Sequence, residues 1–197
     1  MLNRTKLALI IICAIVAMGV IWVVNSYNSI VVAEEEVTAE WANVESQYQR
    51  RADLIPNLVA TVKGYASHEN ETLEAVVNAR AKAIQTTIDV NDFSREAFEK
   101  FQGAQGELNT ALGRLMVISE NYPDLKANQN FCNLQEQLEG TENRIQNSRQ
   151  AYNNKARAYN VMIRRFPNNI FSSLFGFSIV PYFNADVESE KVPQVSF

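Results

Sequence analysis

The feature that most constrains this chain is an uncharged apolar run close to its N-terminus. Residues 7–24 contain no charged side chain, and as a helix they would extend about 27 Å, close to the roughly 30 Å hydrocarbon thickness of a bilayer. Trp22 lies near the far end of the run and Tyr27 just beyond it, where interfacial aromatic residues are found. We therefore predict a transmembrane anchor over residues 7–27. Its anchor residues include Leu7, Trp22 and Val24.

A cleaved signal peptide is the main alternative to an anchor. The sequence Val31-Val32-Ala33 places a small residue before Glu34, as signal peptidase requires, but signal peptides have apolar cores of only about 7–15 residues. A buried core helix would need polar residues on its outer face, and the run has none. A lipid attached at Cys13 is disfavoured because the bulky Ile12 precedes it. An uncleaved anchor fits the run best.

Charge sets the expected orientation of this anchor. Arg4 and Lys6 lie in a basic N-terminus, residues 1–6, whereas all 22 acidic residues follow the run, beginning with Glu34. The positive-inside rule counts Lys and Arg, so it predicts a cytoplasmic N-terminus and a domain on the outer side of a single-pass protein. The net charge is −4 and no basic stripe is present. We therefore expect no nucleic-acid partner.

Beyond the run, apolar residues recur with heptad spacing, which predicts a long helix that continues from the membrane. The stripe comprises Ile30, Val37, Trp41, Val44, Tyr48, Ile55, Leu58, Val62 and Tyr65, with Arg51 as its polar member. Pro56 lies inside this pattern and predicts a kink near Asp53 rather than an end. The stripe is either the chain's own core face or, over Ile30–Val44, a seam between protomers.

Three further helices are expected to follow. The second begins after an N-cap at Ser67 and fades near Thr86, the third begins after Ser94, and Pro123 separates the third from the fourth. The second helix would bury one face formed by Leu73, Val77, Arg80 and Ile84. The fourth has the clearest period, with Phe131, Leu138, Ile145, Tyr152, Tyr159 and Phe166, and is expected to stop at Pro167.

These patterns predict an all-α protein: an N-terminal transmembrane helix followed by an up-and-down four-helix bundle of long antiparallel helices over residues 30–167. The chain has only 7 Gly and 5 Pro, about half of the usual share of roughly 12%, which disfavours turn-rich β folds. A tail over residues 168–197 is apolar at first and then acidic. Its stretch 170–183 holds five Phe or Tyr residues.

This apolar part of the tail is expected to pack back over the end of the bundle. The alternatives are a contact with the membrane interface or with a neighbouring subunit, because exposed apolar patches mark partner sites. The last residues, 184–197, are predicted to form a loose acidic end.

Several polar residues lie on or beside the apolar stripes and are the candidate site. They are Arg51, Asp53, Asn57, Glu142, Arg149, Asn153 and Asn160. Glu142 and Arg149 are seven residues apart, so they share a helix face, and each could reach a charge such as Arg51 or Asp53 on another helix. Such residues either form buried pairs that fix the register of the helices or line a pocket for a ligand or ion.

Catalytic chemistry finds little support in the sequence. The chain has one His, and Cys132 is its one Cys outside the apolar run. Thiolate or imidazole zinc sites, a disulfide within the domain and the two Glu-x-x-His motifs of di-iron bundles are thereby excluded. We expect no metal, no cofactor and no enzymatic activity.

The sequence resembles the LemA family in several motifs. These are Arg50-Arg51-x-Asp53-Leu54-Ile55-Pro56-Asn57-Leu58-Val59, Val62-Lys63-Gly64-Tyr65-Ala66, Tyr122-Pro123-x-Leu125-x-Ala127-Asn128, Thr141-Glu142-Asn143-x-Ile145 and Arg149-x-x-Tyr152-Asn153. The resemblance implies a bacterial membrane-anchored protein with a four-helix up-and-down bundle, which would lie in the cytoplasmic (inner) membrane. It implies no settled activity and no catalytic residues.

The sequence therefore predicts a non-enzymatic, membrane-anchored helical bundle that works by interaction or scaffolding. Its expected partners are the lipid bilayer, further copies of itself and an unidentified membrane protein. The alternative is a ligand-binding or sensory domain that uses the polar residues between the helices.

Overall fold

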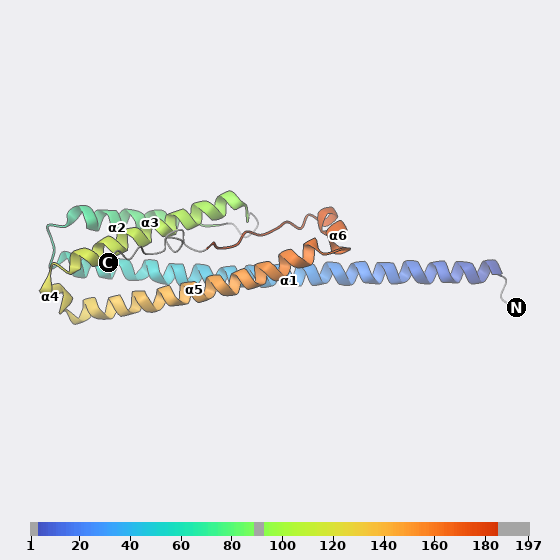
Figure 1. Cartoon of the computed structure of the whole chain (residues 1–197), viewed down its shortest axis with the longest axis horizontal. Helices are drawn as coiled ribbons and strands as arrows, with labels where there is room; N and C mark the ends of the chain where they lie inside the picture. Colours follow the sequence, from blue (N-terminus) through green and yellow to red (C-terminus); the bar gives the residue numbers. More distant parts are fainter. Residues whose placement is uncertain (1–3, 89–92, 185–197) are drawn as a thin grey trace, which may run out of the picture.

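The computed structural model describes residues 4–88 and 93–184, and all of their regular secondary structure is helical (Figure 1). The helices are α1 (Arg4–Lys63), α2 (Asn70–Gln85), α3 (Arg95–Ser119), α4 (Pro123–Lys126), α5 (Gln129–Arg164) and α6 (Asn168–Phe175). The predicted all-α class is confirmed. The number of helices differs from the prediction, because the short helices α4 and α6 are added to the four expected ones.

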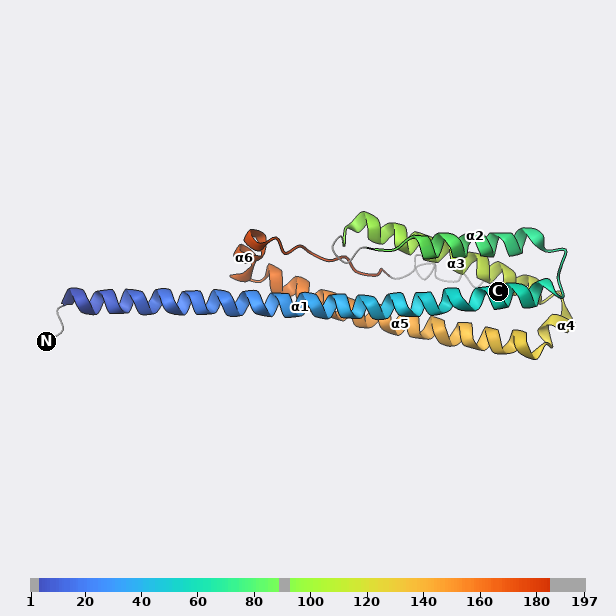
Figure 2. The same cartoon turned by 180° about the vertical axis from the view of Figure 1, so that it is seen from behind.

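The molecule is a long rod built on α1. This helix packs mainly against α5, and the α2/α3 hairpin lies against the half of α1 that is remote from the N-terminus (Figure 1). The helices α1, α2, α3 and α5 run alternately in opposite directions along the rod. From behind, Figure 2 shows the N-terminal part of α1 extending alone beyond the other helices.

The second half of α1 is helical because its heptad stripe is buried against the rest of the chain. Every stripe residue from Ile30 to Val62 is 8% exposed or less, Arg51 included. The stripe is therefore the chain's own core face. Tyr65 is the exception at 44% exposure, because α1 ends at Lys63 and the register is lost. The helix continues through Pro56 as predicted, and the kink near Asp53 stays a prediction.

The apolar run at the start of α1 is exposed, and α6 contacts it only at its end, where Phe171 lies against Trp22. The apolar window of α1 is long enough to cross a membrane, and none of that window is buried. Leu7, Trp22 and Val24 are 48%, 40% and 50% exposed. A helix that is apolar on all sides and is not covered by the rest of the chain is typical of a membrane span.

Of three predicted helix starts, one agrees with the structure and two differ from it. Glu69, not Ser67, precedes α2, and no side chain caps it. Ser94 caps α3 as predicted, with its Oγ accepting a hydrogen bond from the Ala97 N–H at 3.2 Å. Pro123 does begin the next helix, but α4 has only 4 residues, and α5 begins separately at Gln129.

The predicted buried faces are correct for most of α5 but are rotated on α2. Leu73 is buried as predicted, but Val76 and Ala83 are buried in place of Val77, which is 48% exposed. The buried face therefore shares Leu73 with the predicted one and is turned by less than the roughly 100° between neighbouring residues. Phe166 is 76% exposed because α5 ends at Arg164, before the last position of the heptad series.

The core is divided into two apolar clusters along the rod. One contains residues 30–48 of α1, the start of α3 and the second half of α5. The other contains residues 55–62 of α1, Ala66 just after it, α2, the second half of α3 and the start of α5. Arg51 lies between the two clusters. The candidate site is at this division.

Candidate functional site

The buried Arg51 is the centre of a polar layer that links several helices and reaches the surface at Asn109 and Glu142. Its side chain is 4% exposed and donates to Glu142 Oε2 at 3.0 Å, to Asn109 Oδ1 at 3.2 Å and to Gln105 Oε1 at 2.7 Å. The Gln105 amide in turn donates to the Ala83 carbonyl at 3.3 Å. This polar layer (Arg51, Gln105, Asn109 and Glu142) therefore connects α1, α2, α3 and α5.

The layer confirms part of the predicted site and corrects another part. Glu142 reaches Arg51, as the sequence predicts. Asp53 and Asn57 do not join them, because both are exposed, and Asp53 accepts a hydrogen bond from Gln49 at 2.8 Å. At about 100° per residue, positions two and six beyond Arg51 lie on the opposite, solvent-facing side of α1.

Two members of the layer, Gln105 and Asn109, were missed in the sequence, although a signal for Gln105 exists. The buried residues of α3 include Phe98, Phe101 and Leu108, spaced by three and then seven. A helix face requires a residue between the last two, four after Phe101 and three before Leu108. Gln105 occupies that position and is 8% exposed.

Two spaces adjoin the layer at Arg51 and Glu142, and a larger cleft lies next to them. One of the two measures about 70 Å³, enough for about two waters at roughly 30 Å³ each. The other measures about 260 Å³. The neighbouring cleft of about 370 Å³ is lined by Glu45, Tyr48 and Gln105, among others. Burial raises the pKa of the Glu45 carboxyl above its ordinary value of 4.5, and a smaller opposite effect comes from the Trp41 indole N–H.

Metal ligands do not gather in the described part of the chain. Within residues 4–88 and 93–184, no three His, Cys, Asp or Glu side chains converge as metal ligands. The expected lack of a cofactor stays a prediction.

The predicted residues Asn153 and Asn160 bind the backbone of the tail segment (residues 177–184). Asn160 donates to the Val180 carbonyl at 2.8 Å and accepts from the Val180 N–H at 3.0 Å. Asn153 makes the same pair of bonds with Phe183, at 3.0 and 2.9 Å. Each amide thus reproduces the two-bond pairing of neighbouring β-strands.

The spacing of these two asparagines matches the spacing of the tail. Seven residues of α5 rise by about 10.5 Å, and three residues of an extended chain span about 10 Å. The tail segment can therefore stay extended while Val180 and Phe183 both reach an asparagine. This fit explains why polar residues follow a heptad on a face that borders the core.

Arg149 also binds the tail. It donates to the Asn184 carbonyl at 2.9 Å, and its guanidinium lies 4.8 Å from the centre of the Phe183 ring. Phe183 is 6% exposed and packs on Trp41 and Phe98 in the core cluster nearer the N-terminal half of α1. The tail packs back as predicted, but it does so along the side of the helices and not over their end (Figure 1).

Two buried tyrosines complete this contact as hydrogen-bond donors. Tyr152 donates to the Pro181 carbonyl at 3.0 Å, and Tyr159 donates to Glu34 Oε1 at 3.3 Å. Burial raises the pKa of both phenols, and the Glu34 carboxylate raises that of Tyr159 further. Both groups therefore remain protonated and keep their donor role. Residues 185–197, the predicted acidic end, lie outside the described part of the chain.

Comparisons with known proteins place the chain in a family. The magnetosome protein MamQ of Magnetospirillum gryphiswaldense is 27% identical over 175 residues, which are 80% of this chain and 64% of that protein. A MamQ of Paramagnetospirillum magneticum is 27% identical over the same shares, so the chain spans about 64% of the length of these relatives. The LemA protein of Metamycoplasma hominis is 25% identical over 86% of this chain and 73% of its own length. The LemA family model matches residues 40–197, and the chain therefore belongs to the LemA family.

Proposed function

We propose that this protein is a membrane-anchored, non-enzymatic four-helix bundle that acts as a scaffold and associates with copies of itself. One observation carries the proposal: α1 is a single helix from the exposed apolar run to the far end of the core. Residues 30–63 of this helix extend about 50 Å. A rigid rod of that length would present its surfaces at a fixed distance from the bilayer.

The polar layer supports an architectural role. Its groups bind each other, and the two spaces beside Arg51 and Glu142, of about 70 and 260 Å³, are below the roughly 300–1,000 Å³ of small-molecule sites. Buried polar groups are well suited to fix the register of helices. The relatives are named as magnetosome and LemA proteins, and neither name specifies a reaction.

Self-association can be tested with the two native cysteines, which lie in the apolar run and near the start of α5. Cys13 is exposed and Cys132 is partly exposed. If copies associate side by side through their spans, oxidation of the membrane-embedded Cys132→Ala variant gives a disulfide-linked dimer. The matched Cys13→Ala variant gives none through the span. A monomer mass by light scattering in detergent at micromolar concentration, with no crosslinked species from either variant, would refute self-association.

We further propose that the protein spans the bacterial inner membrane with its N-terminus in the cytoplasm and its helical domain outside. Arg4 and Lys6 precede the apolar run, and the next basic residue after it is Arg50, in agreement with the positive-inside rule. A single cysteine at the exposed Ser67, with both native cysteines replaced by alanine, would then react with a membrane-impermeant maleimide in intact cells. If labelling occurs only after cell lysis, the helical domain lies in the cytoplasm and the proposed orientation is wrong.

Ligand binding is the second candidate function, and the cleft of about 370 Å³ beside Glu45 and Gln105 favours it. A metabolite panel screened by thermal shift tests it directly. A ligand of this cleft would raise the Tm of the parent protein and not that of a Gln49→Leu variant, in which an exposed polar residue of the cleft lining is lost. Equal shifts in both proteins would place the ligand elsewhere.

A further inference from the structure

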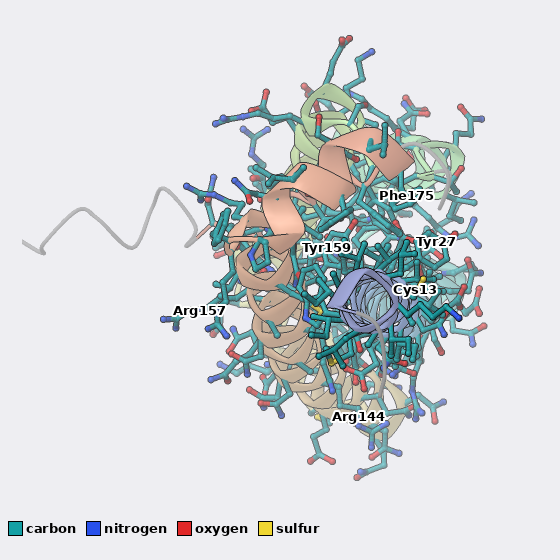
Figure 3. All side chains as sticks on the ribbon, turned by 90° about the vertical axis from the view of Figure 1, so that its right-hand side faces the viewer. Cys13, Tyr27, Arg144, Arg157, Tyr159 and Phe175 are labelled. Atoms are coloured by element: carbon teal, nitrogen blue, oxygen red, sulfur yellow. The ribbon has the colours of Figure 1, made fainter. Side chains whose placement is uncertain are left out.

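The helix α6 lies beside the point where the apolar run of α1 ends. The ring centres of Trp22 and Phe171 are 5.4 Å apart, and those of Tyr27 and Phe175 are 5.1 Å apart. Figure 3, viewed from the N-terminal end, shows α6 crossing the direction of α1, with Tyr27 and Phe175 next to each other. Trp and Tyr at the end of a span mark the level of the lipid headgroups. If α1 crosses the bilayer, α6 lies along its surface.

The remaining face of α6 is apolar and exposed. Ile170 and Leu174 are 57% and 75% exposed, and their spacing of four puts them on one side of α6. Phe166, in the turn that leads into α6, is 76% exposed. The helix itself carries no charge. An uncovered row of large apolar side chains is costly in water.

The structure also prevents this face from turning inward. Ser172 is buried, and its Oγ donates to the Ile163 carbonyl of α5 at 2.9 Å. Gly176, with a φ of 82°, ends α6 in a left-handed conformation and turns the chain back toward the helical domain. The outer face is therefore held away from the core.

Basic side chains adjoin this apolar face. Arg164 and Arg165 are exposed and directly precede Phe166. A short amphipathic helix with apolar side chains on one face and arginines beside it suits the boundary between acyl chains and phosphate groups.

We propose that α6 binds the interface of the bilayer that α1 crosses, with Phe166, Ile170 and Leu174 among the acyl chains and Arg164 and Arg165 at the lipid phosphates. This inference rests on the proposed membrane anchorage. The rod would then have two attachments to one membrane, the span and α6, and its direction relative to the membrane would be fixed. A single helical anchor would leave the tilt and rotation of the rod free.

The test measures the depth of fluorescent labels in the full chain, reconstituted at a low protein-to-lipid ratio into vesicles of phosphatidylcholine and phosphatidylglycerol with brominated acyl chains. One label is placed at Leu174→Cys and a matched control at Val117→Cys on α3, which is 70% exposed, both with the native cysteines replaced by alanine. A third label is placed on Cys13 in the Cys132→Ala variant. We expect the Leu174 label to be quenched more by bromine near the headgroups than by bromine deep in the acyl chains. The Cys13 label should be quenched by the deep bromine. The Val117 label should be quenched by neither.

The outcomes separate this inference from the proposed anchorage. Quenching at Cys13 without quenching at Leu174 would overturn the role of α6 and leave the anchorage intact, whereas no quenching at Cys13 would overturn the anchorage itself. The Leu174 label could instead be shielded from water without being quenched by bromine. If that shielding grows with the protein-to-lipid ratio, the face binds a second copy and not the bilayer. The two arginines are tested by comparing vesicles with and without phosphatidylglycerol. We expect phosphatidylglycerol to increase quenching of the Leu174 label, and we expect this increase to disappear when Arg164 and Arg165 are replaced with glutamine. An increase that persists would overturn the role of the two arginines.

Discussion

At the scale of single residues, polar side chains decide how the helices are aligned. Arg51 brings one charge into the core, and its cost is offset because Glu142, Gln105 and Asn109 all accept its hydrogen bonds. A shift of α1 by one turn would separate Arg51 from these acceptors and leave a buried charge without partners. The apolar positions on either side would tolerate such a shift better, since they are similar to one another.

Removing Glu142 tests this role. We expect Glu142→Ala to lower the free energy of unfolding by about 1.5–3 kcal/mol, because a buried guanidinium loses its charged partner. The control is Glu107→Ala, which breaks a salt bridge to Lys82 whose side chains are 56% and 55% exposed. That change should stay within about 1 kcal/mol. Chemical unfolding followed by circular dichroism in detergent measures both, and equal losses would contradict the role of the polar layer.

Glu45 gives the stability a dependence on pH. Burial raises the pKa of its carboxyl above 4.5, so between 4.5 and the raised value the folded state binds more protons than the unfolded state. Stability therefore falls as pH rises through this window. The Glu45→Gln variant cannot titrate and should be more stable than the parent at pH 7, with the difference fading toward pH 4. Unfolding curves across this pH range check the sign, and a less stable variant at pH 7 would refute it.

At the scale of the elements, the sequence predicts faces well and boundaries less well. The heptad positions of α1 and α5 are buried as predicted, because a long apolar period leaves one way to form a core. The face of α2 was wrong in part, since that helix buries Leu73 as predicted but Val76 and Ala83 in place of Val77, and an alanine carries a weak hydrophobic signal. The helix α6 was missed because its 8 residues are too few to show a period.

The same limit applies to the contact between α5 and the tail. Asn153 and Asn160 were recognised as unusual on an apolar stripe, but their partners are backbone atoms of an extended segment. Backbone groups carry no signature in a sequence. The polar residues could therefore be predicted as a site, whereas what they bind could not.

Replacing Asn160 by alanine isolates this contact. The change leaves the buried N–H and carbonyl of Val180 without their partner, so we expect a loss of about 2–3 kcal/mol. Asn154→Ala on the exposed side of α5 is the matched control, because replacing asparagine with alanine raises the helix propensity equally at both positions. A difference of less than about 0.5 kcal/mol between the two variants, within the range of ordinary surface substitutions, would show that the tail contributes nothing there.

At the scale of the whole molecule, the tail joins parts of the chain that are far apart in sequence. Phe183 contacts Trp41 of α1, Phe98 of α3 and Tyr152 of α5. Heptad patterns indicate which residue faces inward, but they do not show which segment fills the space between two helix pairs. An irregular segment has no period, so its place in the core follows only from the complete structure.

Truncating Phe183 tests whether the tail is a true part of the core. Phe183→Ala should lower the free energy of unfolding by about 3–4 kcal/mol, because it removes a buried ring and leaves a cavity among aromatic side chains. The neighbouring Tyr182→Ala is the control, since Tyr182 is 41% exposed, and its change should be within about 1 kcal/mol. The environment of Trp41 should also change in the first variant, and its fluorescence, read with Trp22 replaced by phenylalanine, reports this separately from stability. If both variants lose stability equally and the Trp41 emission is unaltered, the tail lies on the surface and the helices alone form the core.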